Sequence, residues 1–214
     1  MSQVKGLCVM DVDGTLILEE VIDLLGKEAG CEAEISEITY QAMRGNLDFE
    51  RSLRARVALL KGLPVSVYDT VFKSIHLSKN AQEFISILQK NGILVGLVSG
   101  GFAPIVERLA KYLGISYFYA NELEVKDGFL TGQLVGEIVT AQVKKATLEK
   151  WRMELEIPRE RTIAIGDGAN DLLMLKSAGI SIAFCAKEIV KVEIACHVDT
   201  RDLLEVLPLI DFLE

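Results

Sequence analysis

The chain has few of the side chains that form soft-metal sites or disulfide frameworks. Its 214 residues include 4 cysteines and 2 histidines, which are His76 and His197. The cysteines stand at positions 8, 31, 185 and 196 with no C-x-x-C pair, and Cys8 and Cys185 lie within apolar runs. This spacing excludes a zinc site and a histidine-rich metal site. We therefore expect free, buried thiols in a reducing compartment.

Two other absences narrow the class of protein. No apolar run reaches the roughly 18 residues that a membrane span requires, and the N-terminal run is broken by Asp11, unlike a signal peptide. Positive charge is not in excess: the formal net charge is −8 and the pI is near 5.0, which argues against a nucleic-acid binder. We expect a cytoplasmic monomer or homodimer with no nucleic-acid or membrane partner. An anionic substrate remains compatible, because a metal ion can reverse the local field.

The order of apolar segments predicts the fold class. Half of the residues are apolar, which suits one large domain or one domain with a small insert. Short apolar runs alternate with segments of one-face helical spacing. This alternation predicts an α/β fold, a doubly wound parallel sheet with helices on both faces. The predicted strands are Leu7–Met10, Ile93–Val98, Ile115–Tyr119, Thr162–Ile165 and Ile180–Phe184; the predicted helices are Asn80–Lys90, Pro104–Leu113, Val143–Leu155, Asp171–Ser177 and Arg201–Leu213.

Residues 19–75 interrupt that alternation. Their apolar residues recur at helical spacing, with breaks at Gly30, Gly45 and Gly62. The pattern predicts a small helical bundle inserted after the first strand. Residues 123–134 carry an Asp-Gly turn between short alternating runs, which predicts a β-hairpin.

The segment Asp11-Val-Asp13-Gly-Thr15 directly follows the first apolar run. Residues of equal parity in a strand point the same way, so both acids would project from one strand end. Two carboxylates this close repel each other unless a cation or a shared proton relieves them. The alternative is an ordinary turn in which Asp and Gly supply the turn chemistry.

Polar segments also follow two further strands, where open α/β sheets form their sites. Ser99-Gly100-Gly101-Phe102 offers a hydroxyl and free amides before a helix, which suits an anion; the alternative is a plain strand-to-helix turn. Gly166-Asp167-Gly168-Ala169-Asn170-Asp171 follows the strand at 162–165. Asp171 could be only a helix N-cap, but a metal ligand accounts for Asp167. Oxygen ligands without His or Cys indicate Mg²⁺.

A lysine pair, Lys144 and Lys145, opens the predicted helix 143–155. A cation gains nothing from the helix dipole at this end. If one of the two points inward, it can pair with a phosphate or an aspartate. The alternative is a solvated pair on the surface.

Together these segments resemble the haloacid dehalogenase superfamily of phosphatases. Asp11–Thr15 matches its first motif, the Ser99 region its second, Lys144 its third and residues 166–171 its fourth. Segments 43–57, 98–102, 125–132 and 182–187 resemble the phosphoserine phosphatase family in particular. The resemblance implies a Rossmannoid core of residues 1–15 and 77–214, an inserted helical cap of the C1 type at 16–76, and a β-hairpin flap at 122–134.

The resemblance also implies a role for each matching residue. Asp11 is the nucleophile, and Asp13 is the general acid and base, with its backbone carbonyl on Mg²⁺. Asp11 and Asp167 complete the metal ligands, with Asp171 supporting them. The implied phosphate-binding residues are Ser99, Gly100, Lys144 and Asn170. In the cap, the implied substrate contacts are Glu20 for an ammonium group, Arg56 for a carboxylate, and Met43 and Phe49 for the pocket wall.

The implied activity is Mg²⁺-dependent hydrolysis of O-phosphoserine, the last step of serine biosynthesis, through an aspartyl-phosphate. The alternatives are another small phosphomonoester, such as phosphothreonine or phosphoglycolate, and phosphoryl transfer to an alcohol such as homoserine. A regulatory module without turnover is disfavoured, because binding alone would not need Asp13 as an acid. Position 14 is Gly, where the phosphoserine branch often has Ser. We expect no serine feedback, because no N-terminal regulatory domain precedes the first motif.

Overall fold

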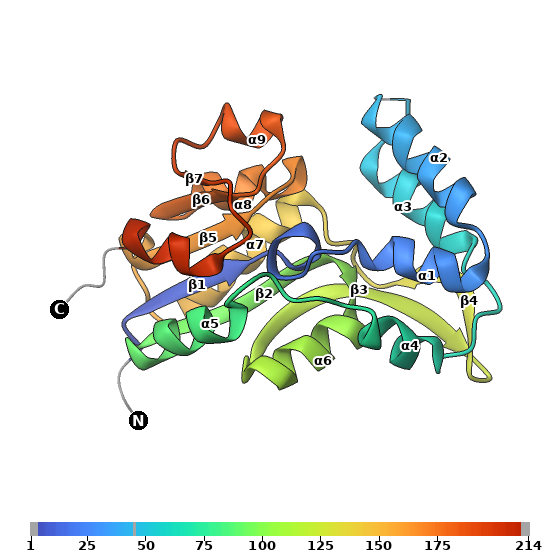
Figure 1. The fold of residues 1–214 in the computed structure, drawn as a ribbon, viewed down its shortest axis with the longest axis horizontal. Coiled ribbons are helices and arrows are strands. Elements are labelled where there is room, and N and C mark those ends of the chain that lie inside the picture. Colours follow the sequence, from blue (N-terminus) through green and yellow to red (C-terminus); the bar gives the residue numbers. More distant parts are fainter. Residues whose placement is uncertain (1–3, 45, 211–214) are drawn as a thin grey trace.

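Seven strands form one sheet at the centre of the protein (Figure 1). The protein is described from a computed structural model, and the described residues are 4–44 and 46–210. The strand order is β4-β3-β2-β1-β5-β6-β7. β3 and β4 are antiparallel, and the other neighbouring pairs are parallel. The strands are β1 (Gly6–Met10), β2 (Ile93–Phe102), β3 (Tyr117–Lys126), β4 (Phe129–Val135), β5 (Thr162–Gly166), β6 (Ile180–Phe184) and β7 (His197–Val198).

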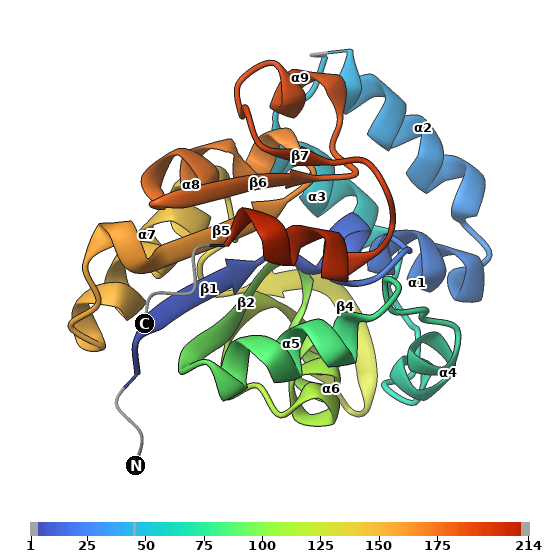
Figure 2. The same cartoon turned by 60° about the vertical axis from the view of Figure 1, so that its left-hand side comes forward.

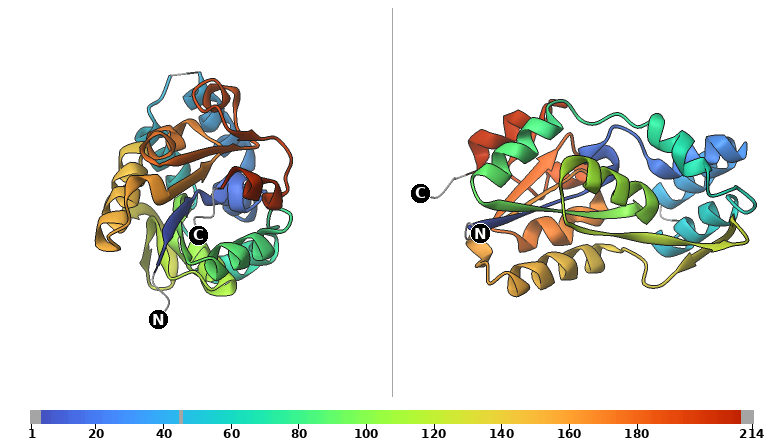
Figure 3. Two further views of the ribbon diagram at one scale, coloured as in Figure 1. Left: turned by 90° about the vertical axis from the view of Figure 1, so that its left-hand side faces the viewer. Right: turned by 90° about the horizontal axis from the view of Figure 1, so that it is seen from below.

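Helices cover both faces of the sheet, so the predicted doubly wound α/β architecture is confirmed (Figure 3). The helices are α1 (Val21–Ala29), α2 (Glu32–Met43), α3 (Phe49–Ala58), α4 (Val67–Lys73), α5 (Ala81–Lys90), α6 (Ala103–Leu113), α7 (Ala141–Glu154), α8 (Leu172–Ser177) and α9 (Glu188–Lys191). Short 3-10 helices lie at Arg159–Arg161, Ala169–Asp171 and Leu203–Leu209.

The central strand β1 shows why this sequence forms a sheet buried on two sides. All five of its residues are buried. Leu7 and Val9 pack in one apolar cluster with residues of α7 and α8, whereas Cys8 and Met10 pack in the other with residues of α5 and α6. Because successive strand side chains point to opposite faces, an unbroken apolar run is what a strand covered on both sides requires.

The helices α1–α4 gather at one end of the molecule, with the hairpin of β3 and β4 beside them (Figure 1). The hairpin turns at Asp127 and Gly128, whose φ values are +52° and +81°, as an Asp-Gly hairpin turn requires. Its second strand is tied to the segment after α3: the Gly62 amide donates to the Leu130 carbonyl and the Leu130 amide to the Leu63 carbonyl. The hairpin predicted at 123–134 is therefore present and joined to the helical group.

Several elements differ from the prediction. The strand predicted at 115–119 is β3, which continues to Lys126 as the first strand of the hairpin, and the short strand β7 was not predicted. β2 runs on to Phe102 through a register shift between Ser99 and Phe102, so the polar segment expected to follow the strand as an anion site lies inside the strand, and the alternative of a plain strand-to-helix turn is wrong. The helix predicted at 201–213 is a 3-10 helix over Leu203–Leu209 that contains Pro208. Proline lacks the amide hydrogen that an α-helix needs for its hydrogen bonds. The rest of the predicted helix, residues 211–213, lies outside the described part of the chain. Among the described residues, no helix has the length and apolar character needed to cross a bilayer.

Candidate active site

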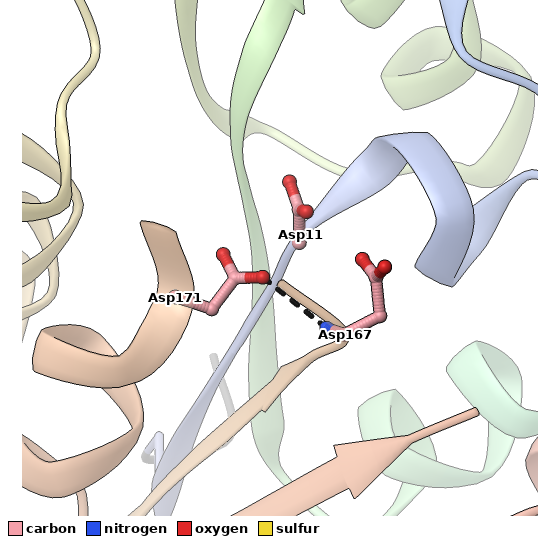
Figure 4. Close-up of side chains that lie close together, drawn as sticks. All are labelled: Asp11, Asp167 and Asp171. Atoms are coloured by element: carbon pink, nitrogen blue, oxygen red, sulfur yellow. Dashed lines mark hydrogen bonds between the residues drawn. The ribbon is translucent and has the colours of Figure 1, made fainter. Parts of the chain in front are cut away.

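Three polar segments meet where the parallel strands β1, β2 and β5 end. Asp11 follows β1, Ser99 lies near the end of β2, and Asp167 follows β5. Figure 4 shows Asp11 and Asp167 projecting from neighbouring strand ends, with Asp171 reaching in from the helical turn after β5. One carboxylate oxygen of each lies within 4.8 Å of the other two. The common edge of a parallel sheet brings together acids that are far apart in the sequence.

Lys144 lies between two acids of this cluster, Asp11 and Asp171. Its ammonium donates to Asp11 Oδ1 and to Asp171 Oδ1, at 2.6 Å each, and the side chain is fully buried. The hydroxyl of Thr140 caps the start of α7 by accepting from the Val143 amide, which places Lys144 on the first turn. Burial opposes its charge, but Asp11 and Asp171 more than offset this and raise its pKa. Of the lysine pair in the sequence, Lys144 therefore points inward and Lys145 is exposed.

Asp171 is held by groups of the protein at both of its oxygens. Oδ1 accepts from Lys144, and Oδ2 accepts from the backbone amides of Asp167 and Gly168 at 3.2 and 3.0 Å. The residue is fully buried. It therefore fixes the loop that carries Asp167 and the position of Lys144.

The charge balance of the cluster indicates room for a further cation. Burial, and then the neighbouring Asp171, raise the pKa of Asp11 well above its usual range and that of Asp167 to about 6. Lys144 is shared between Asp11 and Asp171, and the Lys187 ammonium lies 3.9 Å from Asp167 Oδ2. Hard carboxylate oxygens are the ligands that Mg²⁺ and Ca²⁺ prefer. The residues present therefore fit a divalent metal ion held by oxygen ligands.

Asp13 lies beside this cluster with one oxygen unused. Its Oδ2 accepts from the Val21 amide at 2.9 Å, whereas its Oδ1 is buried and has no hydrogen-bond partner among the described residues. Burial, followed by repulsion from Glu20, raises the pKa of Asp13 to about 8. Gly101 permits this approach, since a Cβ there would stand 3.0 Å from Asp13 Oδ1. A carboxyl group with an unpaired oxygen facing a cavity is suited to moving a proton.

A cavity of about 530 Å³ opens above these acids and is lined by Asp11, Asp13 and Asp167 at its base. Glu20, Phe49 and Arg56 line it from the helical group, and Gly100 and Asn170 line it from the core. Lys144 and Ser99 are fully buried and are not among the lining residues described for this cavity. The Ser99 hydroxyl accepts from the Gly101 amide at 2.8 Å. Met43 ends α2, but its side chain is outside the described part of the chain.

Glu20 and Arg56, which carry opposite charges, both line this cavity. Burial lowers the pKa of the Arg56 guanidinium, and Glu20 and Asp23 oppose that effect through their charges. The Arg56 Nε–H donates to the Ser52 carbonyl at 3.3 Å, along its own helix. The guanidinium is thus held against α3 beside two carboxylates, in a position to receive an anion.

The sequence did not indicate every residue of the site. Asp23 and Lys187 also line the cavity, and the Thr15 hydroxyl donates to Asp167 Oδ1 at 3.3 Å. Lys187 lies just after β6. Its place after the end of the predicted strand 180–184 is the feature of the sequence that could have indicated it as a site residue. Ile189 on α9 and Ala42 on α2 line the same cavity, and Figure 2 shows both helices at the top of the view. Nothing in the local pattern around Asp23 distinguishes it from an exposed helix residue.

The fold and this acidic strand-end site define a class of hydrolytic enzyme. Residues 8–176 match the model of the haloacid dehalogenase-like hydrolase family, and the chain belongs to that family. It is 56% identical over 211 residues to the phosphoserine phosphatase of Streptococcus thermophilus, a match that covers 99% of this chain and 98% of that protein. The predicted family is confirmed.

Solved structures give the same result. A substrate-bound phosphoserine phosphatase complex superposes with a TM-score of 0.91 at 44% identity, covering 97% of this chain and 99% of that one. A phospho-aspartyl intermediate analogue of phosphoserine phosphatase has a TM-score of 0.91 at 45% identity, with the same coverage. Both comparisons span the sheet, the helical group and the hairpin.

Proposed function

We propose that this enzyme hydrolyses the phosphate ester of O-phosphoserine through a phosphorylated Asp11. The single observation that carries the proposal is the cavity. It has Asp11 and Asp13 at its base and a Glu20–Arg56 pair of opposite charge on its wall. A phosphorylated amino acid has a dianion at one end and an ammonium with a carboxylate at the other. The similarity to a phosphoserine phosphatase solved with substrate supports this choice.

In the first step, a carboxylate oxygen of Asp11 attacks phosphorus. The new bond joins that oxygen to phosphorus, and the bond from phosphorus to the serine oxygen breaks. Asp13 gives its proton to the leaving oxygen, for which its unpaired Oδ1 is available. In the second step Asp13 takes a proton from water and the water oxygen bonds to phosphorus; the bond from phosphorus to the Asp11 oxygen breaks, which leaves the Asp11 carboxylate and inorganic phosphate. The similarity to a phospho-aspartyl intermediate analogue supports this order.

Positive charge has to offset the repulsion between Asp11 and the phosphate dianion. Lys144 lies 2.6 Å from Asp11 and would contribute to phosphate binding with Ser99, Gly100 and Asn170. Gly100 and Asn170 are neighbours, since a Cβ on Gly100 would stand 3.9 Å from Asn170 Nδ2. Asp11, Asp167 and the backbone carbonyl of Asp13 would hold Mg²⁺, with Asp171 supporting them. When bound, the ion supplies neutralising charge at the phosphate oxygens.

The amino-acid end of the substrate is assigned to the helical group. Arg56 would bind the carboxylate through its planar fork, and Glu20 would bind the ammonium group. Phe49 and Met43 would line the pocket between them; a Cβ on Gly100 would stand 3.8 Å from the Phe49 ring. We therefore assign residues 16–76 as a cap domain over a core of residues 1–15 and 77–214, with residues 122–134 as a flap.

A cytoplasmic site of action is also part of the proposal. All four cysteines lie in the described residues and are free, which fits a reducing compartment. The expectation of buried thiols holds for Cys8 and Cys31 only, because Cys185 is half-buried and Cys196 is exposed. Small phosphomonoesters are the proposed partners, and the net charge of −8 disfavours nucleic acid. A monomer and a homodimer both accommodate a cavity formed within one chain.

A substrate panel with an Arg56 variant tests the proposal. O-phosphoserine, phosphothreonine, phosphoglycolate and p-nitrophenyl phosphate are compared with Mg²⁺, with and without homoserine as acceptor. We expect the highest kcat/KM for O-phosphoserine.

Arg56→Ala should raise KM for O-phosphoserine by about 100-fold, as a lost charged contact does. KM for the aryl phosphate should change by less than about threefold. The exposed Arg54→Ala is the matched control. Equal effects of Arg56→Ala on both substrates, or faster turnover of another ester, would contradict the assignment.

A further inference from the structure

The turn that carries Asp13 is held from outside the cavity by two side chains. It spans residues 12–16 and is closed by a hydrogen bond from the Ile17 amide to the Val12 carbonyl at 3.0 Å. Gly14 has a φ of +73°, a conformation that other residues rarely adopt. Among the described residues, no backbone amide donates to the carbonyls of Gly14 and Thr15, so the donors to these carbonyls must be side chains or water.

Those bonds come from distant parts of the chain. Arg201 Nη1–H donates to the Gly14 carbonyl at 2.5 Å, across 187 residues of sequence. The Ser78 hydroxyl, which is buried, donates to the Thr15 carbonyl at 2.6 Å, across 63 residues. Two successive peptide groups of the turn are therefore fixed by side chains that do not line the cavity.

The two donors are also fixed relative to each other. The Lys79 amide donates to the Arg201 carbonyl and the Leu203 amide to the Lys79 carbonyl, at 3.0 Å each. The Asp202 carboxylate accepts from the Asn80 side chain and from the Lys79 ammonium, each at 2.8 Å. The 3-10 helix that follows packs against α5, which keeps both segments in place.

On its other side, the same turn contacts the reacting groups. The Thr15 hydroxyl donates to Asp167 Oδ1, and a Cβ on Gly14 would stand 3.1 Å from the Asp167 carboxylate. The Asp13 carboxylate accepts a hydrogen bond from the amide of Val21, the first residue of α1. A rotation of the peptides at Gly14 and Thr15 would therefore move Asp13 and Asp167 relative to Asp11.

We propose that Arg201 is a positioning residue that, with Ser78, orients the turn carrying Asp13 for proton transfer. The guanidinium is suited to this because it stays charged and directs several donors in one plane. It touches neither the cavity nor the acids, so it acts through the Gly14 peptide. The proposal rests on the proposed function, in which Asp13 serves both chemical steps.

Steady-state kinetics of Arg201→Gln, Arg201→Lys and Ser78→Ala test this proposal. Small displacements of a reacting group can cost about 100-fold in rate, so we expect Arg201→Gln to lower kcat by about 10- to 100-fold. KM for O-phosphoserine should change by less than about threefold, because Arg201 and Ser78 do not line the cavity and Arg56 lies on α3, away from the turn they hold. Arg201→Lys should recover part of kcat, and Ser78→Ala should lower it in the same direction. Arg161→Gln is the matched control, because Arg161 is exposed and directly precedes β5, at the amino ends of the parallel strands and away from the site.

The outcomes separate positioning from mere stability. Each variant is also measured with p-nitrophenyl phosphate and by thermal unfolding. A kcat of Arg201→Gln within about twofold of the parent, whatever its Tm, overturns the proposal, as does a loss that Arg201→Lys does not recover at all. If the parent turns over the aryl phosphate but not O-phosphoserine, the proposed substrate fails, while the kcat of the Arg201 variants on the aryl phosphate still decides the positioning role.

Discussion

At the scale of single residues, the site is a set of carboxylates that differ in what holds them. Asp171 has both oxygens engaged by Lys144 and two amides, Asp13 has one engaged oxygen and one unpaired, and Asp11 shares Lys144. Burial raises the pKa of Asp11, Asp13 and Asp167. These different environments are the physical basis for assigning different jobs to four chemically identical groups.

Asp11→Asn should abolish turnover while the chain stays folded. An amide is not a nucleophile toward phosphorus, so activity should fall by at least about 1000-fold. Acid-quenched parent enzyme should carry a phosphoryl group on the peptide with Asp11, detected by mass spectrometry, and the variant should not. Asp127→Asn in the hairpin turn is the control. Substantial activity in Asp11→Asn would remove the nucleophile assignment.

Lys144→Met should destabilise the fold strongly. The ammonium is fully buried between Asp11 and Asp171, and its removal leaves buried carboxylates without their cation. Breaking a buried ion pair in this way costs about 3–5 kcal/mol, measured as the free energy of unfolding in urea. The neighbouring Lys145→Met is the matched control, because its side chain is exposed and should change stability by less than about 0.5 kcal/mol. Equal stability of the two variants would contradict the central place of Lys144.

At the scale of elements, the hairpin of β3 and β4 is a support for α3. A Cβ on Gly132 in β4 would stand 3.0 Å from the Ala58 carbonyl of α3, and the segment after α3 is hydrogen-bonded to β4. α3 carries Arg56 and Phe49. The hairpin therefore helps to determine where the proposed substrate contacts lie, although it is far from α3 in the sequence.

Two glycine variants isolate this contact. Gly132 and Gly128 have φ values of +82° and +81°, but nothing lies within 4 Å of a Cβ on Gly128. Alanine should therefore cost about 1–2 kcal/mol of backbone strain at both positions. Gly132→Ala should lose about 1–3 kcal/mol more through the clash with α3 and should raise KM for O-phosphoserine. Urea unfolding and initial rates measure both effects; equal losses in the two variants would show that the hairpin does not support α3.

At the scale of the whole molecule, one sheet edge gathers the chemistry and the helical group closes the space above it. The acidic cluster, the cavity and the lining residues of α1 and α3 all lie at the carboxyl ends of the strands. The net charge of −8 and the acids of the cavity repel an anionic substrate, so its binding depends on cations close to the site. Stability and activity should therefore both respond to a divalent metal.

Mg²⁺ should raise Tm, and EDTA should remove activity that Mg²⁺ restores. At about 100 times its Kd, a ligand of the folded state stabilises by about 2.7 kcal/mol, or roughly 5–10 °C for a chain of this size. Thermal unfolding with and without Mg²⁺, against NaCl of equal ionic strength, measures this effect. Asp167→Asn should lose most of the shift. Activity that resists EDTA, or an equal shift in that variant, would contradict the metal assignment.

The sequence by itself determined the α/β class, the strands and the candidate acids, because buried strands read as apolar runs and their polar ends stand out locally. The resemblance in four short segments led to the family. The resemblance already favoured Lys144 over Lys145. Only the tertiary structure decided that Lys144 is shared between Asp11 and Asp171, that both oxygens of Asp171 are engaged, and that Lys187 joins the cavity. Arg201 and Ser78 reach the turn after β1 from 187 and 63 residues away, and such contacts leave no local pattern. These hydrogen bonds form only when folding brings together segments that are far apart in the sequence.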